Sequence, residues 1–323
     1  MKIELTIENP DTGKTYYPSV EDGVKWTTDR TGAAGQLEFS VVKDSVINFR
    51  EGNRVKLKAD GQGIFSGFVF KKKRNKDGLI SVTAYDQLRY LKNKNTRVYS
   101  NKRASELLRE IAEDFGLNVG EIEDTGYVIA NRCMENTSEL DTIQDALDLT
   151  LSCTGRMYVF YDDFGSLCLK DISSMISRMV ISAQTAEDFE YETSIDSDVY
   201  NKIRLCFMNN EKNENEFYDL SDDESISRWG VLQYFEKIDD PLMAPAAAKS
   251  LLELYSGKKR SLSVSGVIGD LSVRAGSQVP VVLDLGDIVT NGYLIVEKCS
   301  HSFGAGKHTM DLELMGGEFE FGV

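Results

Sequence analysis

Two histidines near the end of the chain, His301 and His308, are the first candidates for chemistry. They flank a Phe-Gly-Ala-Gly turn sequence, and a two-residue turn at Gly304-Ala305 would place them opposite each other across a hairpin. Two facing imidazoles can share a zinc ion, here with Asp311 as a third ligand. No cysteine or further histidine stands at ligand spacing. We therefore interpret His301 and His308 as a hydrogen-bonded or interface pair and keep them as candidate metal ligands.

The stretch GQGIFSG, residues 61–67, has the glycine content of a phosphate-binding loop. A dinucleotide loop must follow a strand and open a helix, so that the phosphates meet the helix N-terminus. Here the glycines are followed by Phe-Val-Phe-Lys-Lys, which alternates like a strand, and the third glycine comes one residue late. The pattern predicts a hairpin turn at Asp60-Gly61 and a bulge or close backbone approach at Gly67.

Other catalytic patterns are incomplete. Asp-Phe-Gly occurs at 114–116 and at 163–165, but the remaining kinase motifs are missing, and we interpret the first triplet as a helix end and the second as a turn. Neither G-x-S-x-G nor HExxH is present. The acidic runs 121–124 and 219–224 stand in loop-like polar sequence and favour solvated carboxylates. We therefore predict no catalytic residues and no cofactor. A cell-wall hydrolase with an unidentified carboxylate pair is the alternative.

The elements that would position these residues are mainly strands. Residues 1 to about 92 form short alternating runs bounded by Gly, Asn or Asp, which indicates a small sandwich or barrel. A period of 3.6 then predicts a helix that starts at Ser100 or Asn101 and ends at Gly116, and a second helix from about 137 that ends at Gly155. A hairpin follows over 156–172, with its turn at 162–165.

The last part of the chain returns to strands. A polar loop interrupts them at 209–216, and one helix, opened by Pro241, runs over about 241–257. Residues 66–86 resemble 291–314, since each segment begins with a small polar residue, a glycine and an aromatic residue and continues as strand, turn and strand. The alternatives are an internal duplication and the chance convergence of two hairpins.

Charge and composition exclude several classes of protein. The chain has 37 Lys plus Arg against 52 Asp plus Glu, a net charge of −15, which argues against a protein that grips nucleic acid. Its dense basic run, 71–76, is typical of a solvated hairpin tip. No apolar run reaches the roughly 20 residues of a membrane span, and the N-terminus lacks the pattern of a secretory signal. Five scattered cysteines indicate free thiols in a reducing cytoplasm.

Several segments, taken in order, carry a resemblance to one known family. They are IFSGFVFKK and SVTAYDQLRYL within 64–91, ASELLREIAEDFGL at 104–117, LDTIQDALDLTLSCTGRMYVFYDDFGSLCLKDI at 140–172, VYNKIRL at 199–205, RWGVLQYFEKID at 228–239, SVRAGSQVPV at 272–281 and VEKCSHSFGAGKHTMDLEL at 296–314. Over nearly the whole chain, these segments resemble the baseplate hub proteins of contractile phage tails and phage-tail-like bacteriocins, of the type found in defective prophages of Gram-positive bacteria.

The resemblance implies a homotrimer at the distal end of the tail tube. Each subunit of such a hub carries two similar small β-barrels, so three subunits form a pseudo-sixfold ring that joins the tail tube to the central spike. The implied partners are further copies of the chain, tube and spike proteins and other baseplate proteins, without sequence-specific nucleic-acid binding or a membrane span. The implied location is the baseplate of a virion or tail-like particle assembled in the bacterial cytoplasm. The family offers no catalytic residues to carry over.

We expect an α+β, mainly β fold, with two small β-barrel or sandwich domains and an α/β module between them. The expected domains are 1–96, a β-barrel; 97–180, two helices and a hairpin; and 181–323, a second β-barrel-like region with one helix. Edge strands and the acidic segment 208–224 are expected to face neighbouring subunits. The residues expected at structural or interface positions are Gly67, Phe68, Gly292, Tyr293, Lys71, Lys72, Lys73 and Arg74.

Overall fold

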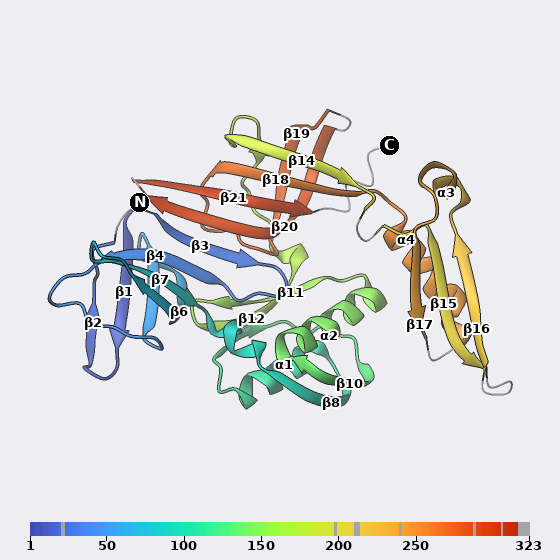
Figure 1. Ribbon diagram of the computed structural model, residues 1–323, viewed down its shortest axis with the longest axis horizontal. Coiled ribbons are helices and arrows are strands. Elements are labelled where there is room, and N and C mark those ends of the chain that lie inside the picture. Colours follow the sequence, from blue (N-terminus) through green and yellow to red (C-terminus); the bar gives the residue numbers. More distant parts are fainter. Residues whose placement is uncertain are drawn as a thin grey trace. The chain divides into compact units, whose positions relative to one another are not determined.

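The computed structural model describes residues 1–20, 23–196, 199–209, 214–238, 241–286, 289–304 and 306–315 (Figure 1). Strands dominate, and the expected α+β, mainly β class is confirmed. The described residues group into two units: the first joins Met1–Glu190 to the chain from Ser263 onward, and the second is Tyr191–Leu262. The expected boundaries at residues 96 and 180 stay a prediction.

A single 13-stranded sheet runs through the first unit. Its first half contains β1 (Ile3–Asn9), β2 (Lys14–Tyr16), β3 (Val24–Asp29), β4 (Gln36–Val42), β5 (Arg54–Ala59), β6 (Gln62–Arg74) and β7 (Leu79–Tyr85). Its second half contains β13 (Ile181–Ser182), β14 (Asp188–Ser194), β18 (Lys259–Ile268), β19 (Gln278–Asp284), β20 (Val289–Gly304) and β21 (Lys307–Met315). The chain crosses between the two units within β14 and β18.

Each half of the sheet curls back on itself. In the first half, Val20 forms a bridge with Val41 of β4, which brings the segment after β2 across to β4. In the second half, β13 pairs with β19, and the N–H of Glu187 donates to the carbonyl of Ser265 in β18 at 3.1 Å, so the segment 181–187 connects β19 with β18. Alternation along the strands puts one row of apolar side chains inside, such as the fully buried Leu37 and Leu57. Antiparallel pairing of β3 with β20 joins the two halves.

The stretch that resembled a phosphate loop is a turn and a strand. Asp60 and Gly61 have φ of 47° and 85°, the left-handed pair that a tight hairpin requires, and β6 starts at Gln62. Gly67 allows a close approach of backbone to backbone, because a Cβ there would lie 2.2 Å from the carbonyl oxygen of Tyr85. Both predictions for this stretch, a turn at Asp60-Gly61 and a close approach at Gly67, are confirmed.

The α/β module packs two helices against short strands. Its elements are the 3₁₀ helix η1 (Gln87–Lys92), β8 (Lys94–Lys102), α1 (Ala104–Asp114), β9 (Val119–Ile122), β10 (Ile129–Ser138), α2 (Glu139–Thr154), β11 (Tyr158–Asp163), β12 (Ser166–Asp171) and the short 3₁₀ helix η2 (Ile172–Ser174). The ends of α1 and α2 at Gly116 and Gly155, with φ of 61° and 70°, are as predicted. The Asp-Phe-Gly triplets are a helix end and a turn, also as predicted.

Two features of the module differ from the sequence analysis. The helix α1 starts at Ala104 rather than at Ser100 or Asn101, because Ser100 and Lys102 pair with β10. Strands β8, β9 and β10 were also missed. Their sequences are largely polar, since β8 and β10 bury only a few side chains, such as Tyr99 and Ile129, so hydrophobic alternation is weak.

The second unit is a three-stranded sheet with one helix against it. It contains β15 (Lys202–Asn209), β16 (Glu214–Ser221), α3 (Asp223–Trp229), β17 (Gln233–Lys237), the 3₁₀ turn η3 (Pro241–Met243) and α4 (Ala244–Tyr255). Ile203 and Leu205 of β15 pack against Ala244 and Ala248 of α4. The acidic run 219–224 was interpreted as loop, but it contains the end of β16 and the start of α3. Asp222 explains the error, because its carboxylate caps α3 rather than facing only water.

Candidate interaction surfaces

The two histidines do meet, although not as direct cross-strand neighbours. Gly304 pairs with Lys307, so the turn lies one residue later than expected, and His308 pairs with Phe303 while His301 pairs with Met310. The imidazoles are diagonal neighbours on one face of the hairpin, and Nδ1 of His301 lies 2.9 Å from Nε2 of His308.

Hydrogen bonding fixes the protonation of this pair. Nε2 of His301 lies 2.9 Å from the carbonyl oxygen of Val273, which can only accept, so His301 carries its proton on Nε2. Its Nδ1 then accepts the proton that His308 donates from Nε2. His301 is fully buried and stacked on Trp26, with ring centroids 4.7 Å apart. Burial, with a smaller contribution from His308, lowers the pKa of His301 to about 3, so the ring is neutral at physiological pH.

The third proposed zinc ligand, Asp311, is not brought to the two histidines. Asp311 lies one position from Met310 and Leu312, which point inward, so its side chain is on the opposite face of β21, where it accepts from the N–H of Gly266 at 3.1 Å. Among the residues that the structure describes, no group of three histidine, cysteine or acidic side chains is arranged to hold a metal ion. The geometry of His301 and His308 is that of a hydrogen-bonded pair inside the second half of the sheet.

Phe68 belongs to a half-buried aromatic row on the outside of the first half of the sheet, made of Phe68, Phe70, Tyr85 and Tyr90. The rings of Phe68 and Tyr90 meet edge to face at 5.8 Å between centroids. The guanidinium of Arg54 lies 5.4 Å from the centre of the Phe68 ring, and that of Arg89 lies 5.5 Å from the centre of Phe70. Aromatic and arginine side chains of this kind are enriched at protein interfaces.

The basic residues of the β6–β7 hairpin divide into two groups. Lys72 is engaged within the chain, since its Nζ donates to the carbonyl oxygen of Phe49 at 2.6 Å and lies over the ring of that residue. Lys71, Lys73 and Arg74 are exposed, with no ion pair described for them. These three side chains are therefore the part of the hairpin that is available to a partner.

Reversing the charge at these three exposed positions, with glutamate at Lys71, Lys73 and Arg74, is expected to weaken, at least tenfold at low salt, association with the partner proteins that the family resemblance implies. The reason is the loss of complementary charge at an interface, which also lowers the association rate. Incorporation into particles measures the effect. A matched reversal at Lys237, Lys249 and Lys258, which are also exposed, controls for net charge. Full incorporation of the hairpin variant would remove this surface from consideration.

The long strands β6 and β20 have the same plan of pairing. The first part of β6 pairs with β5 and the rest with β7, and β20 pairs in the same order with β19 and β21. Each contains a bulge in its pairing with the later strand, between Val69 and Lys71 in β6 and between Val296 and Lys298 in β20. The three-strand units β5–β6–β7 and β19–β20–β21 are therefore built alike.

The loops that lead into the two units match as well. Gly52, before β5, has φ of 84°, and Gly276, before β19, has φ of 88°. The N–H of Gly52 donates to the carbonyl of Val69 at 2.8 Å, and the N–H of Gly276 donates to that of Val296, also at 2.8 Å. The shared bulge and the shared glycine contact support an internal duplication over chance convergence.

The duplication has a different register from the one read in the sequence. Because the two glycine contacts match, Val69 is the counterpart of Val296 in the structure. Two residues earlier on each strand, Gly67 is then the counterpart of Leu294. The sequence comparison instead aligned Gly67 with Gly292. Gly67 is buried, and a side chain there would collide with the carbonyl oxygen of Tyr85. Tyr293 is about half exposed on β20. Interface roles for Phe68, Gly292 and Tyr293 stay predictions.

A buried polar cluster was missed in the sequence. The carboxylate of Asp86 accepts from the N–H groups of Gly35 and Leu88, and the N–H of Gly165 donates to Asp162. The guanidinium of Arg274 donates to the carbonyl of Asp162 and lies 3.8 Å from the centre of the Tyr161 ring. Burial raises the pKa of Asp162 to about 6 and also raises that of Asp86. The cluster ties the two halves of the sheet to the module.

A shallow cavity of about 320 Å³ on the outside of the second half of the sheet gathers four carboxylates. They belong to Asp188, Glu190, Asp311 and Glu313. Lys298, also at the cavity, is paired with Glu313 at 3.3 Å. Carboxylates gathered beside a surface cavity are an arrangement that the hydrolase alternative could use.

The comparison with known proteins places the chain in a family. Residues 24–315 match the model of the YQBQ-like family, and the chain belongs to that family. It is 30% identical over 306 residues to the phage-like element PBSX protein XkdQ of Bacillus subtilis strain 168, with 92% of each chain covered. The resemblance to phage baseplate proteins of defective prophages, inferred from the sequence, is confirmed at this level.

Solved structures share the fold. The chain superimposes on the 43 kDa tail protein of prophage MuSo2 from Shewanella oneidensis with a TM-score of 0.73 and 12% identity, covering 98% of both chains. It superimposes with a TM-score of 0.56 and 10% identity on the c3393 protein of E. coli, covering 97% of this chain and 76% of that one. The c3393 protein is described as a component of the type VI secretion system with structural similarity to the T4 bacteriophage tail proteins gp27 and gp5. Among the described residues, no helix is long and apolar enough to span a membrane.

Proposed function

We propose that this chain is the structural hub of a contractile-tail baseplate, a homotrimer that joins the tail tube to the central spike. The observation that carries the proposal is the repeated three-strand unit, β5–β6–β7 and β19–β20–β21, with its shared bulge and glycine contact. Three copies of a chain with two such units present six similar edges around a threefold axis, which is what a sixfold tube requires of a threefold partner.

The relatives support a role in a phage tail. XkdQ belongs to a phage-like element, and the fold is shared with a prophage tail protein and with c3393. On this proposal the protein is made and assembled in the bacterial cytoplasm, is carried in the baseplate of a virion or bacteriocin particle, and contacts tube, spike and other baseplate proteins. Its work is assembly rather than catalysis, and stable contacts between copies should bury well above about 2,000 Å² each.

Native mass measurement tests the proposal. The pure protein is expected to run at three times the mass of one chain, and complexes formed after mixing with the tube and spike proteins of its particle are expected to contain three copies of it. A ring closed by heterologous contacts should show no stable dimer. A protein that stays monomeric in every mixture and binds neither tube nor spike would contradict the hub function.

The hydrolase alternative has its own test. If the carboxylates of Asp311 and Glu313 cleaved peptidoglycan, the purified chain would clear a cell-wall gel, and the amide variants Asp311→Asn and Glu313→Gln would not. We expect no clearing by the chain itself. Clearing that depends on these two side chains would replace the hub by the hydrolase.

A further inference from the structure

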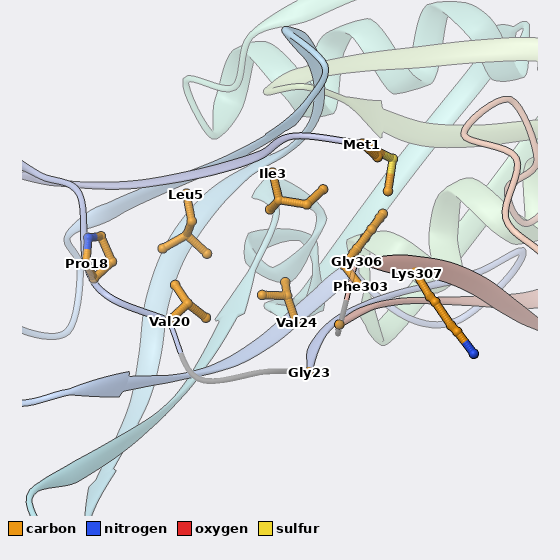
Figure 2. Close-up of a pocket in the computed structure, with 11 residues that line it drawn as sticks. Met1, Ile3, Leu5, Pro18, Val20, Gly23, Val24, Phe303, Gly306 and Lys307 are labelled. Atoms are coloured by element: carbon orange, nitrogen blue, oxygen red, sulfur yellow. The ribbon is translucent and has the colours of Figure 1, made fainter.

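A cavity of about 380 Å³ opens on the first half of the sheet, at the seam where its curl is incomplete (Figure 2). Ile3 and Leu5 of β1 line one side and point toward Val20 and Val24 on the other, and Phe303 closes one end. Seven of the eleven residues that line it have apolar side chains, and its size is that of a binding site rather than a packing defect.

The seam also has an unpaired strand edge. β1 pairs with β5 along Ile3–Glu8, but on its other side β2 pairs only with Ile7, Glu8 and Asn9. In the part of the chain that the structure describes, the segment from Ile3 to Thr6 has no strand partner on that side. An open edge beside an apolar cavity is the arrangement that accepts an added strand, with backbone hydrogen bonds to the edge and alternate side chains in the cavity.

The chain itself contains a segment suited to this site. Residues 316–323 read Gly-Gly-Glu-Phe-Glu-Phe-Gly-Val and lie outside the described residues. Phe319 and Phe321 alternate with Glu318 and Glu320, so in an extended conformation both phenyl rings share one face and both carboxylates the other. Two aromatic anchors on one face and charges on the other suit an apolar seam that is open to water.

The segment cannot reach the seam of its own chain. Lys307, the first residue of β21, lines the cavity, and β21 runs from there to Met315. Eight strand steps put Met315 roughly 27 Å from the cavity. Phe319 follows Met315 by four residues and can return at most about 14 Å, and Phe321 at most about 22 Å. A second copy of the chain must supply the segment.

We propose that residues 316–323 of one copy bind as an added strand along Ile3–Thr6 of the next copy, with Phe319 and Phe321 in the seam cavity. This inference rests on the proposed trimer and names the contact that closes it. The contact is heterologous, with the tail of each copy on the seam of the next, as a threefold ring requires.

Peptide binding tests the contact directly. The probe is a labelled synthetic peptide of residues 316–323, and its control carries serine at both phenylalanines. The receptor is the full chain with Phe319→Ser and Phe321→Ser, so that its own tail does not compete. We expect the peptide to bind at least tenfold more tightly than its control, and to lose that preference when the receptor also carries Val20→Lys. Circular dichroism and the unfolding midpoint check that the Val20→Lys receptor is folded. Equal binding of the two peptides, or binding unaffected by Val20→Lys in folded protein, overturns the proposal.

Cross-linking tests whether residues 316–323 bind to a neighbouring copy of the chain. Cys133 and Cys153, the exposed cysteines, are first replaced by serine. One chain then carries Ile3→Cys and a second, tagged chain carries Phe321→Cys. Mild oxidation of the mixture is expected to join the two chains through a disulfide. Two results would contradict the contact of residues 316–323 without contradicting the hub function. One is a chain with both cysteines that forms only an intramolecular disulfide, and the other is a native trimer in which no disulfide joins two chains. Wild-type protein that neither trimerises with its partners nor binds the peptide overturns both.

Discussion

Replacement of Arg97 by methionine is expected to lower the free energy of unfolding by about 3–5 kcal/mol. Arg97 of β8 is 10% exposed, and its guanidinium donates from Nε and Nη2 to the two oxygens of Glu139, at 2.9 Å each. Glu139, at the start of α2, has no exposed side-chain surface. The same guanidinium reaches Asp114 of α1 at 2.7 Å, and hydrogen bonding to Glu139 raises the pKa of Arg97. Methionine fills the space but leaves a buried carboxylate without its cation.

Arg132 provides the matched control. It makes the same two-pronged contact with Asp145 of α2, at 2.7 and 3.1 Å, from the neighbouring strand β10. Its side chain is 39% exposed and that of Asp145 is 25% exposed, so water can solvate the carboxylate that is left behind. Arg132→Met should therefore cost about 1 kcal/mol or less. Urea unfolding followed by circular dichroism measures both variants, and equal losses would show that burial of Glu139 does not govern the effect.

The second large effect is a pH dependence centred on His301. The pKa of His301 is about 3 in the folded protein, against about 6.5 in an unfolded chain. Between these values the unfolded state binds a proton that the folded state refuses, so stability falls as pH falls below about 6.5. The free energy of unfolding falls by about 1.4 kcal/mol for each pH unit below 6.5, which is roughly 3 kcal/mol at pH 4.5.

Other groups around His301 set the size of this effect. The side chains of His308 (β21), Cys299 (β20) and Trp26 (β3) contact the His301 ring. The charge of Arg274 lowers the pKa of His301, and the charge of Asp270 raises it. His308 also has a lowered pKa, which adds a loss of the same sign below its unfolded value.

Asp162 acts in the opposite direction and makes a variant comparison necessary. Its pKa of about 6 lies above the usual carboxyl value, so the folded state holds a proton that the unfolded state has lost between about pH 4 and 6. Stability from Asp162 is present at low pH and declines as pH rises through 6. The wild-type curve is the sum of these opposing changes, with Asp86 acting in the same direction as Asp162.

The measurement compares wild type with His301→Gln at pH 7, 5.5 and 4.5. Glutamine keeps an N–H for the carbonyl of Val273 but cannot take up a proton. We expect the variant to be the less stable protein at pH 7, because the stacking on Trp26 is lost, and to lose about 3 kcal/mol less than wild type on going to pH 4.5. Parallel curves for the two proteins would show that the folded protein does not hold His301 neutral.

Much of the fold follows from local sequence patterns. The Asp60-Gly61 turn, the strand after it and the close approach at Gly67 could be predicted, because the turn needs particular residues and the strand alternates. The helices α1 and α2 were predicted from apolar period and from Gly116 and Gly155 at their ends. These features depend on neighbours within a few positions along the chain.

Elements without such patterns were missed or misplaced. The strands β8, β10 and β16 bury few side chains, so nothing in their alternation distinguishes them from loops. Asp222 and its acidic neighbours looked solvated, since a helix cap is recognised only when the helix that follows is known. The hairpin that carries His301 and His308 was predicted, but its turn was placed one residue early.

The sequence alone determined the class of fold, the family resemblance and the presence of two similar β regions. Tertiary structure decided the register of the duplication, the buried cluster of Asp86, Asp162 and Arg274, and the open seam beside β1. The tertiary structure also joined the two halves of the sheet. The hydroxyl oxygens of Thr27 in β3 and Ser300 in β20 form a hydrogen bond at 3.1 Å, although the two residues are 273 positions apart in the sequence. Pairing at that separation is selected by the burial and hydrogen bonding of whole strands, a sum over distant residues that no short window of sequence contains.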